Sequence, residues 1–429
     1  MSRRVTLGLA FVLLYAFAIL SIGLTREWEL LHEDNGALHT TLALSHVRLG
    51  LGRTRAHDYF FEPKSGLEGR YGAHPPGTAL ALAGAFWLTG SDTPAVARLV
   101  AIAFHLGSIA LMIVLLCHVL DPLTALIGGA LMATLPMGAF FGRMVNYEAL
   151  CLFAILMQLL GYVLWSRTGS RRGLALIAAG IVVGGLVDWP AFFFAGAMTI
   201  AAAVTCARRR PVEIGPVALL AAATGGMAVL DVAHLWSVAP AGARSLRLVE
   251  KLSSGPTLGG SGALDPLGFL VGQLEIARRY YTDAGLISAV VVAAALLVRR
   301  RPIAARLFIA SDPALLQRLL LITGGAAVAY VLVAPGWARI HAYWQFYALP
   351  YVVLAMLLVG HGLFRLGRER GEIWPRALLA ALVVDAAVGS ATTLHYRHTT
   401  PSAHTVRQVS DLRARTMLPA YLEGKPGER

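Results

Sequence analysis

The sequence predicts an all-α, polytopic membrane protein. Of its 429 residues, 57% are hydrophobic and only 14% are charged, and the mean hydropathy is +0.64. Soluble domains carry roughly 25% charged residues. The apolar residues also form blocks of about 18 to 22, the length that crosses about 30 Å of hydrocarbon as a helix. We therefore expect a bundle of membrane-spanning helices rather than a large soluble core.

The basic residues indicate how this bundle is oriented. The net charge of +13 is compatible with nucleic-acid binding, but its placement argues against it. Arginines cluster at the ends of apolar blocks, as in Arg3-Arg4, Arg171-Arg172, Arg208-Arg209-Arg210, Arg299-Arg300-Arg301 and Arg365 with Arg368 and Arg370. Such clusters mark cytoplasmic loops. We expect a cytoplasmic N-terminus, an extracytoplasmic C-terminal tail and no nucleic-acid partner.

The apolar blocks predict about eleven crossings. These are residues 5–24, 97–118, 122–136, 148–166, 173–189, 191–207, 215–237, 285–298, 315–334, 344–364 and 374–394. The first block resembles a signal peptide but lacks an Ala-x-Ala cleavage site, so we expect an uncleaved helix. Residues 75–90 are apolar but short, and counting them as a crossing would place the arginine triplets outside. We interpret them as an interfacial or re-entrant helix.

Three regions are then large and extracytoplasmic. We expect a module of residues 1–237 that includes the loop 25–96, a second loop at 238–284, further membrane helices at 285–394 and a tail at 395–429. The second loop contains Ser253-Ser254-Gly255-Pro256 and Gly259-Gly260-Ser261-Gly262, which are typical of flexible segments. A long loop within a compact fold is usually functional, so residues 25–96 are the first place to look for a site.

The cysteines predict neither a disulfide framework nor a zinc site. Cys117, Cys151 and Cys206 are odd in number, and all three lie in apolar segments without a Cys-x-x-Cys pair. We interpret them as packing residues.

Polar side chains collect at the predicted outer ends of the helices, where burial makes an ionisable group costly unless it has a partner or a function. The candidate acids are Asp34, Glu33 beside it, and Glu148 in the first turn of a helix. Candidate substrate-binding residues are Arg98, His74, His105, Arg143, Arg339, His341 and Tyr343. An arginine such as Arg98 suits a lipid phosphate, because its guanidinium binds phosphate oxygens in a bidentate way.

Each candidate also has a structural interpretation. Asp34 fits a solvated acidic loop, Arg98 a snorkelling side chain, and His105 a core histidine. Asn146 fits a helix cap before Glu148, and Tyr343 fits an aromatic belt with its neighbours. If Asp34 and Arg98 act together, they must converge on one cavity at the outer membrane surface.

The pattern resembles the GT-C glycosyltransferases, in the branch similar to protein O-mannosyltransferases and aminoarabinose transferases. The resemblance spans roughly residues 1–365 and rests on Glu33-Asp34-Asn35-Gly36, Gly50-Leu51-Gly52, Tyr71-Gly72-Ala73-His74-Pro75-Pro76, Ala97-Arg98-Leu99, Gly142-Arg143-Met144-Val145-Asn146-Tyr147-Glu148 and His341-Ala342-Tyr343-Trp344. It implies a GT-C bundle whose long first extracytoplasmic loop contains juxtamembrane helices.

The resemblance also implies an activity. A sugar passes from a polyprenyl-phosphate donor to an acceptor hydroxyl on a lipid, glycan or protein, on the extracytoplasmic face and with inversion. Asp34 takes the role of general base, Glu148 that of the second acid, and Arg98 that of a donor-phosphate contact. Many relatives have Asp-Glu where this chain has Asp34-Asn35, so a role for Glu33 stays open. Some relatives bind a divalent cation, but these residues do not decide the matter.

The Arg- and Ala-rich composition suggests a GC-rich bacterium, so we expect the protein in the inner membrane. Two other classes of function remain open. Asp188, Asp231 and Asp385 lie within predicted apolar segments, as charged groups do in transporters and lipid flippases. A non-catalytic relative that only binds lipid-linked sugar is the third possibility.

Overall fold

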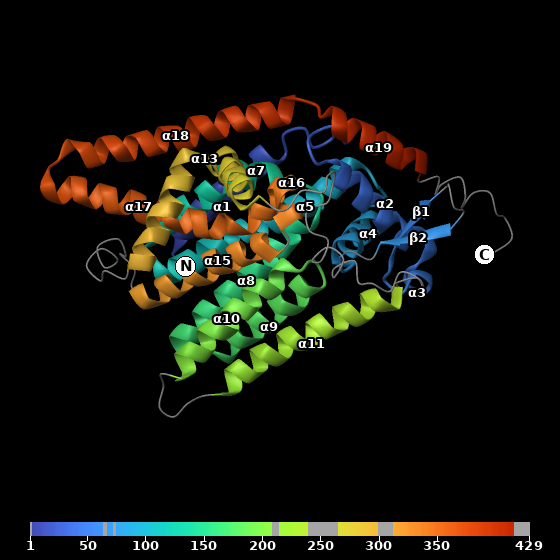
Figure 1. The fold of residues 1–429 in the computed structure, drawn as a ribbon, viewed down its shortest axis with the longest axis horizontal. Coiled ribbons are helices and arrows are strands. Elements are labelled where there is room, and N and C mark those ends of the chain that lie inside the picture. The colour runs from blue at the N-terminus through green and yellow to red at the C-terminus, as the bar shows by residue number, and fades with distance from the viewer. Residues whose placement is uncertain are drawn as a thin grey trace.

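The structure is a computed structural model that describes residues 2–62, 67–71, 74–207, 214–238, 265–298, 312–333 and 335–415. These residues are almost entirely helical, with one two-stranded hairpin (Figure 1). The elements are α1 (Arg3–Leu20), α2 (Asp34–Leu49), α3 (Leu51–Thr54), β1 (Asp58–Glu62), β2 (Leu67–Tyr71), α4 (Gly77–Thr89), α5 (Pro94–Val119), α6 (Pro122–Thr134), α7 (Pro136–Phe141), α8 (Tyr147–Thr168), α9 (Arg171–Gly185), α10 (Pro190–Ala207), α11 (Gly215–Val238), α13 (Pro266–Val298), α15 (Pro313–Val333), α16 (Pro335–Ile340), the 3₁₀ helix η1 (Ala342–Ala348), α17 (Leu349–Arg370), α18 (Ile373–Thr399) and α19 (Ala403–Arg415).

The chain is a multi-pass integral membrane protein. Among the described residues, nine helical segments are long and apolar enough to span a bilayer, namely α1, α5, α8, α10, α11, α13, α15, η1 with α17, and α18. The predicted crossings at 122–136 and 173–189 form α6 and α9, of only 13 and 15 residues. About 20 residues are needed to cross hydrocarbon, so the count of eleven stays a prediction. The short segment 75–90 contains the helix α4, as expected.

Local sequence explains where several helices begin and end. Asp121 caps α6 by accepting hydrogen bonds from the backbone N–H groups of Leu123 and Thr124. Pro94 stands in the first turn of α5, where its missing N–H costs nothing. Gly169, with a φ of 67°, ends α8 in the left-handed conformation that glycine adopts most readily.

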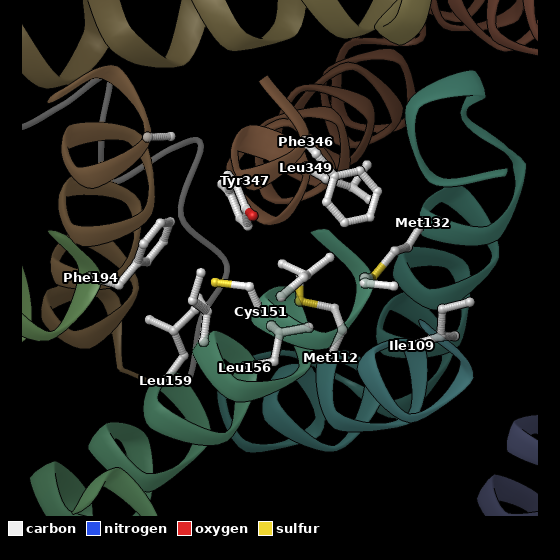
Figure 2. Close-up of a cluster of buried hydrophobic side chains, with 14 of the residues drawn as sticks. Ile109, Met112, Met132, Cys151, Leu156, Leu159, Phe194, Phe346, Tyr347 and Leu349 are labelled. Atoms are coloured by element: carbon white, nitrogen blue, oxygen red, sulfur yellow. The ribbon is translucent and has the colours of Figure 1, made fainter. Parts of the chain in front are cut away.

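The core of the bundle is built around α8. This is the most enclosed of the nine spanning segments, and it packs mainly against α9 and α5. Figure 2 shows its residues Cys151, Leu156 and Leu159 facing side chains of α5, α6, α10 and the η1–α17 segment, including Met112, Met132, Phe194 and Tyr347. The core therefore joins the N-terminal helices to the C-terminal ones.

The loop 25–96 contains compact structure. The helices α2 and α4 pack together, and β1 and β2 pair antiparallel from Asp58 opposite Tyr71 to Glu62 opposite Leu67. In Figure 1 this group lies at one end of the bundle, with the hairpin at its far edge. The juxtamembrane helices were expected, whereas the sequence analysis did not anticipate the hairpin, which makes the fold class almost rather than wholly α.

The later segments differ from the expected loop and tail. The prediction for 238–284 treated these residues as a loop, but the structure is helical from Pro266 onward and α13 breaks at Thr282, whose φ is 64°. The Ser253–Pro256 and Gly259–Gly262 stretches lie outside the described residues, as do the triplets 208–210 and 299–301. The tail begins with the end of α18 and then forms α19, which packs on α2 (Figure 1). Residues 416–429 lie outside the described part.

Candidate active site

Glu33 joins the segment after α1 to α5. One carboxylate oxygen accepts a hydrogen bond from Nη2 of Arg98 at 2.9 Å. The other accepts from the backbone N–H groups of Glu29 and Leu30, both at 3.0 Å. Since Glu33 and Arg98 are only 7% and 1% exposed, this is a buried ion pair whose geometry depends on both partners.

Arg98 also organises the backbone before Glu33. Its guanidinium donates to the carbonyl oxygens of Leu24 at 2.9 Å, Glu27 at 3.3 Å and Arg26. It also lies 4.4 Å from the ring centre of Trp28, a favourable cation–π geometry. The donors of Arg98 thus face protein acceptors, and the expected contact between Arg98 and a donor phosphate stays a prediction.

Arg143 reaches the same segment from the α7–α8 connection. It donates to the carbonyl oxygens of Ile22 and Gly23 and lies 3.8 Å from Glu33 and 3.4 Å from Nδ1 of His398. Burial lowers the pKa of Arg143 to about 10, a shift that Glu33 opposes. Arg143 therefore remains charged at neutral pH and adds a second cation beside Glu33.

Asp34 follows Glu33 as the first residue of α2, the helix on which α19 packs. The helix N-terminus favours a carboxylate at this position. Burial raises the pKa of Asp34, while its own backbone amide, His404 and Thr405 oppose the shift. A carboxylate with a raised pKa accepts a proton more readily, which suits a general base.

Gly36 allows α2 to lie close to the segment before it. A Cβ atom at this position would stand 2.4 Å from Cζ3 of Trp28. Trp28 in turn covers the guanidinium of Arg98. Close packing against Trp28 therefore explains the glycine at position 36 without any role in catalysis.

Glu148 lies in a second polar group, at the start of α8. Nδ2 of Asn146 donates to one oxygen of Glu148 at 3.4 Å, and Oδ1 of Asn146 lies 2.9 Å from Nε2 of His39 on α2. The side chain of Asn146 makes no capping hydrogen bond to α8. The other oxygen of Glu148 is buried and has no hydrogen-bond partner among the described residues.

Asp188 completes this group from the end of α9. It accepts hydrogen bonds at 2.8 Å from Nδ1 of His74 and from the backbone N–H of Trp189, and the hydroxyl of Tyr347 lies 3.3 Å away. His74 stacks on Tyr147 with ring centres 4.2 Å apart. We refer to His39, His74, Asn146, Glu148 and Asp188 as the acid–histidine cluster.

The sequence analysis did not assign Asp188 to this group and did not single out His39. His39 is five residues beyond Asp34 on α2, and its ring meets Tyr147 edge-on at 4.6 Å. Gly77, which follows His74-Pro75-Pro76, brings this segment close to the end of α9. Its N–H donates to the carbonyl of Leu186 at 2.7 Å, and a Cβ atom at this position would clash with that oxygen. A signal for Asp188 was present in Asp188-Trp189-Pro190, a charge at the end of an apolar block.

The late motif forms an aromatic wall beside His32, two residues before Asp34. His341 stacks between Trp337 and Tyr343, with ring centres at 5.6 and 4.9 Å. Tyr343 meets the ring of His32 edge-on at 5.2 Å. Burial, followed by the nearby His341, lowers the pKa of His32 to about 3, so this ring is neutral at physiological pH. Arg339 lies exposed on α16, next to this wall.

The structure therefore brings most of the predicted residues to one end of the bundle but divides them into three neighbouring groups. His105 stands apart from them. It is buried in α5, packs against Gly142 and the ring of Phe346, and neither ring nitrogen has a hydrogen-bond partner among the described residues.

The described residues do not provide a ready metal centre. No group of three or more histidine, cysteine, aspartate or glutamate side chains within the described ranges has a geometry that holds a metal ion. The unpartnered oxygen of Glu148 is a single donor, so a divalent cation stays an open prediction.

The comparisons with known proteins identify the fold. No protein-family model matches the sequence, and no curated protein sequence matches it. Among solved structures, ArnT from Cupriavidus metallidurans bound to undecaprenyl phosphate is similar over 96% of this chain and 78% of its own, with 12% identity and a TM-score of 0.58. The oligosaccharyltransferase AglB from Archaeoglobus fulgidus, in complex with an inhibitory peptide and a dolichol-phosphate, is similar over 92% of this chain, with 14% identity and a TM-score of 0.57.

This chain spans 56% of the length of the archaeal enzyme. Identities this low establish the fold and not the reaction. The chain therefore has the fold of the GT-C glycosyltransferases.

Proposed function

We propose that this protein is a membrane glycosyltransferase that moves a sugar from a polyprenyl-phosphate donor to an acceptor hydroxyl. The observation that carries the proposal is the position of Asp34. Its partly buried carboxylate stands at the N-terminus of α2, beside the Glu33–Arg98 ion pair, in a fold shared with two transferases whose structures contain dolichol-phosphate or undecaprenyl phosphate. The proposed setting is the extracytoplasmic face of a bacterial inner membrane.

The reaction needs few groups from the protein. The acceptor oxygen bonds to the anomeric carbon, the bond from that carbon to the phosphate oxygen breaks, and polyprenyl phosphate leaves with the electron pair. Asp34 accepts the proton of the acceptor hydroxyl, a contribution that is typically worth 10²- to 10⁴-fold in rate. A single displacement of this kind inverts the anomeric configuration.

The leaving phosphate needs positive charge nearby, because electrostatic stabilisation of developing charge is usually the largest catalytic contribution. Arg339 is exposed beside the aromatic wall, and we assign it, together with His341 and Tyr343, to the sugar-phosphate end of the donor. The guanidinium groups of Arg98 and Arg143 already donate hydrogen bonds to backbone carbonyl oxygens. Either arginine would have to break one of these hydrogen bonds in order to bind a phosphate.

The acid–histidine cluster is assigned to the acceptor side. One carboxylate oxygen of Glu148 has no hydrogen-bond partner in the described part of the chain, and Asp188 fixes the ring of His74 through Nδ1. These groups are suited to hold a polar acceptor in place rather than to take its proton, which is the role given to Asp34.

The test is sugar transfer in proteoliposomes, with a panel of polyprenyl-phosphate sugars and mixed lipid, glycan and peptide acceptors. We expect Asp34→Asn to lower kcat by about 10²-fold or more while the protein still binds donor. Asp283→Asn is the matched control, because Asp283 forms an exposed ion pair with Arg278 on α13. Equal rates for wild type and Asp34→Asn would remove Asp34 as the base.

The same preparation separates the other functions. Movement of the lipid-linked sugar between leaflets without transfer identifies a flippase. Saturable donor binding without either transfer or movement identifies a non-catalytic binding protein.

A further inference from the structure

The bundle contains an apolar groove that the proposed reaction does not use. Its volume is about 750 Å³, and its walls come from α6, α13, α17 and α18. The other walls are mainly apolar like the α18 wall, as with Ile127 of α6 and Met356 of α17. On α18 the lining residues recur at the spacing of a single helix face, namely Leu379, Leu382, Val383, Ala386, Ala387 and Ser390.

The groove follows from the way in which α18 is attached. The helix α17 packs against both α6 and α18, while α6 packs otherwise on α5 and α1, and α18 on α13. Of the nine spanning segments found in the described residues, α18 is the least enclosed, and Figure 1 shows it along one edge of the bundle. Protein interiors hold few voids larger than a water molecule. A space of this size is therefore not an ordinary imperfection of packing.

The groove is open at one end and closed at the other. Leu123, in the first turn of α6, and Phe364, near the end of α17, are 67% and 55% exposed. Leu135, which directly follows α6, is 1% exposed, as is Ser390 on α18, and Ser288 on α13 is 2% exposed. A ligand therefore enters from the end marked by Leu123 and Phe364.

This open end lies at the membrane surface opposite the candidate site. Arg98 stands near the start of α5, and Asp121 follows the end of that helix. From Arg98 to Val119 the helix rises about 32 Å, which matches a hydrocarbon thickness of about 30 Å. The α18 wall rises about 17 Å from Leu379 to Ser390, close to the depth of one leaflet. The groove therefore has the length of a lipid tail of the leaflet opposite the site.

Basic side chains without partners lie at the open end. His361 lines the groove, and Arg368 follows it by seven residues on the same face of α17. Neither has a hydrogen bond or an ion pair with another residue of the described ranges. Two carboxylates at this end are engaged already, because Asp121 caps α6 and Glu369 pairs with Arg365. The open end therefore suits a negatively charged head group.

The volume indicates the size of the apolar part of the ligand. An apolar cavity of roughly 150 Å³ holds one benzene molecule. On this scale the groove accommodates on the order of thirty carbon atoms. Two acyl chains of a membrane phospholipid have this size.

We propose that the groove is a binding site for one anionic phospholipid of the leaflet opposite the candidate site. The acyl chains fill the space between α6 and α18 as far as Ser390, and the phosphate lies at the open end beside His361 and Arg368. Basic pockets between membrane helices bind anionic head groups in the same way. The inference goes beyond the proposed function and does not depend on it.

The first test measures lipid binding by the full-length protein. The protein is delipidated in detergent and titrated with phosphatidylglycerol, or with phosphatidylcholine of the same acyl chains, and native mass spectrometry counts the bound lipids. We expect one phosphatidylglycerol to bind about fivefold or more tightly than phosphatidylcholine. Equal affinities for the two lipids would overturn the proposal.

A matched pair of variants on α18 locates the site. Ala386→Phe places a ring in the groove, whereas Ala381→Phe places the same ring on the exposed face of the same helix. We expect phosphatidylglycerol to bind about tenfold more weakly to Ala386→Phe, because the ring displaces methylene groups of the lipid, and with wild-type affinity to Ala381→Phe. Undiminished binding to Ala386→Phe would show that the lipid binds elsewhere.

The head-group contact has its own variant. Arg368 is exposed, so its replacement leaves the packing of the bundle intact. We expect Arg368→Gln to bind phosphatidylglycerol about fivefold more weakly and phosphatidylcholine as before. An equal affinity of wild type and Arg368→Gln for phosphatidylglycerol would contradict the assigned orientation of the lipid.

Thermal unfolding is a second readout, since a ligand that binds only the folded protein raises its midpoint. We expect phosphatidylglycerol to raise the midpoint of wild type and Ala381→Phe, but not that of Ala386→Phe. Displacement of phosphatidylglycerol by a polyprenyl phosphate whose own binding is lost in Ala386→Phe would assign the groove to the sugar-donor lipid. A delipidated wild type that is dimeric beside a monomeric Ala386→Phe would assign it to a second copy of the chain. Either result overturns the proposal.

Discussion

Nη2 of Arg98 lies 2.9 Å from Oε1 of Glu33, and both side chains are almost completely buried. The pair joins the first turns of α5 to the chain that leads into α2. Glu33 and Asp34 are adjacent in sequence, yet the first is bound by arginines from inside the bundle and the second begins α2, the helix on which α19 packs. Neighbouring carboxylates thus have different environments, and the role of base is proposed for Asp34, whose pKa is raised by burial.

The first prediction concerns this ion pair. Arg98→Met leaves Glu33 charged and buried without its main partner, and breaking a buried pair in this way costs about 3–5 kcal/mol. We expect a clear fall in the thermal unfolding midpoint of the detergent-solubilised protein. Arg339→Met is the control, since Arg339 is exposed and such substitutions usually stay within about 0.5 kcal/mol. Equal midpoints for Arg98→Met and wild type would show that Arg98 does not stabilise the fold.

The second prediction concerns Gly36. A methyl group at this position meets the ring of Trp28 at 2.4 Å, and overpacking of this kind costs about 1–3 kcal/mol. We expect Gly36→Ala to destabilise the protein, and the double substitution Gly36→Ala with Trp28→Leu to be less destabilised than the sum of the two single changes. Strict additivity of the unfolding midpoints would contradict the contact.

The sequence allowed the membrane class to be predicted, together with the gathering of most candidate polar residues at one end of the bundle, because both follow from local patterns. Apolar block length identifies spanning helices, and polar residues at block ends collect where those ends meet. A helix too short to cross the membrane within 75–90 followed from the same length argument and is present as α4, whereas its interfacial or re-entrant position stays a prediction.

The specific partners of each side chain could not be predicted in this way. Arg98 was expected to face a ligand phosphate, yet its donors are used by the carbonyls of residues 24, 26 and 27 and by Glu33. The partners of Arg98 depend on how the segment between α1 and α2 folds back against α5, and a sequence pattern does not reveal that path. Asp188 joins the acid–histidine cluster through a hydrogen bond with His74, 114 residues away in the sequence, a separation at which periodicity carries no information.

The third prediction concerns the pair formed by His74 and Asp188. Asp188→Ala removes the acceptor for Nδ1 of His74 and for the hydroxyl of Tyr347, so the ring of His74 loses its fixed orientation. Misplacement of a positioning group by about 1 Å is enough to cost roughly 10²-fold in rate. We expect this loss in the transfer assay, and a smaller one for Asp188→Asn, which still accepts a hydrogen bond.

Asp312→Ala serves as the control for that series. Asp312 accepts a hydrogen bond from the N–H of Leu315 at the start of α15, and none of its hydrogen bonds with the described residues joins the acid–histidine cluster. Full activity in Asp188→Ala, with turnover equal to that of Asp312→Ala, would place Asp188 outside the reaction.

The fourth prediction is a dependence of stability on pH that originates in His39. Burial lowers the pKa of His39 from 6.5 to about 4, and the hydrogen bond with Asn146 only partly opposes this. Between these values the unfolded chain binds a proton that the folded protein does not, so stability decreases as the pH falls through this window. From pH 7 to pH 5 the linkage amounts to about 2 kcal/mol for this one residue.

His39→Gln isolates this effect, because the amide of glutamine can still donate to Oδ1 of Asn146 but does not titrate. His32, whose pKa is about 3, acts in the same direction, and the raised pKa of Asp34 acts in the opposite one. Both are present in wild type and variant, so they cancel in the difference. We expect the unfolding midpoint of wild type to fall more steeply than that of His39→Gln between pH 7 and pH 5. Parallel curves would mean that His39 is protonated within the fold, and that the acid–histidine cluster carries one more positive charge than its burial indicates.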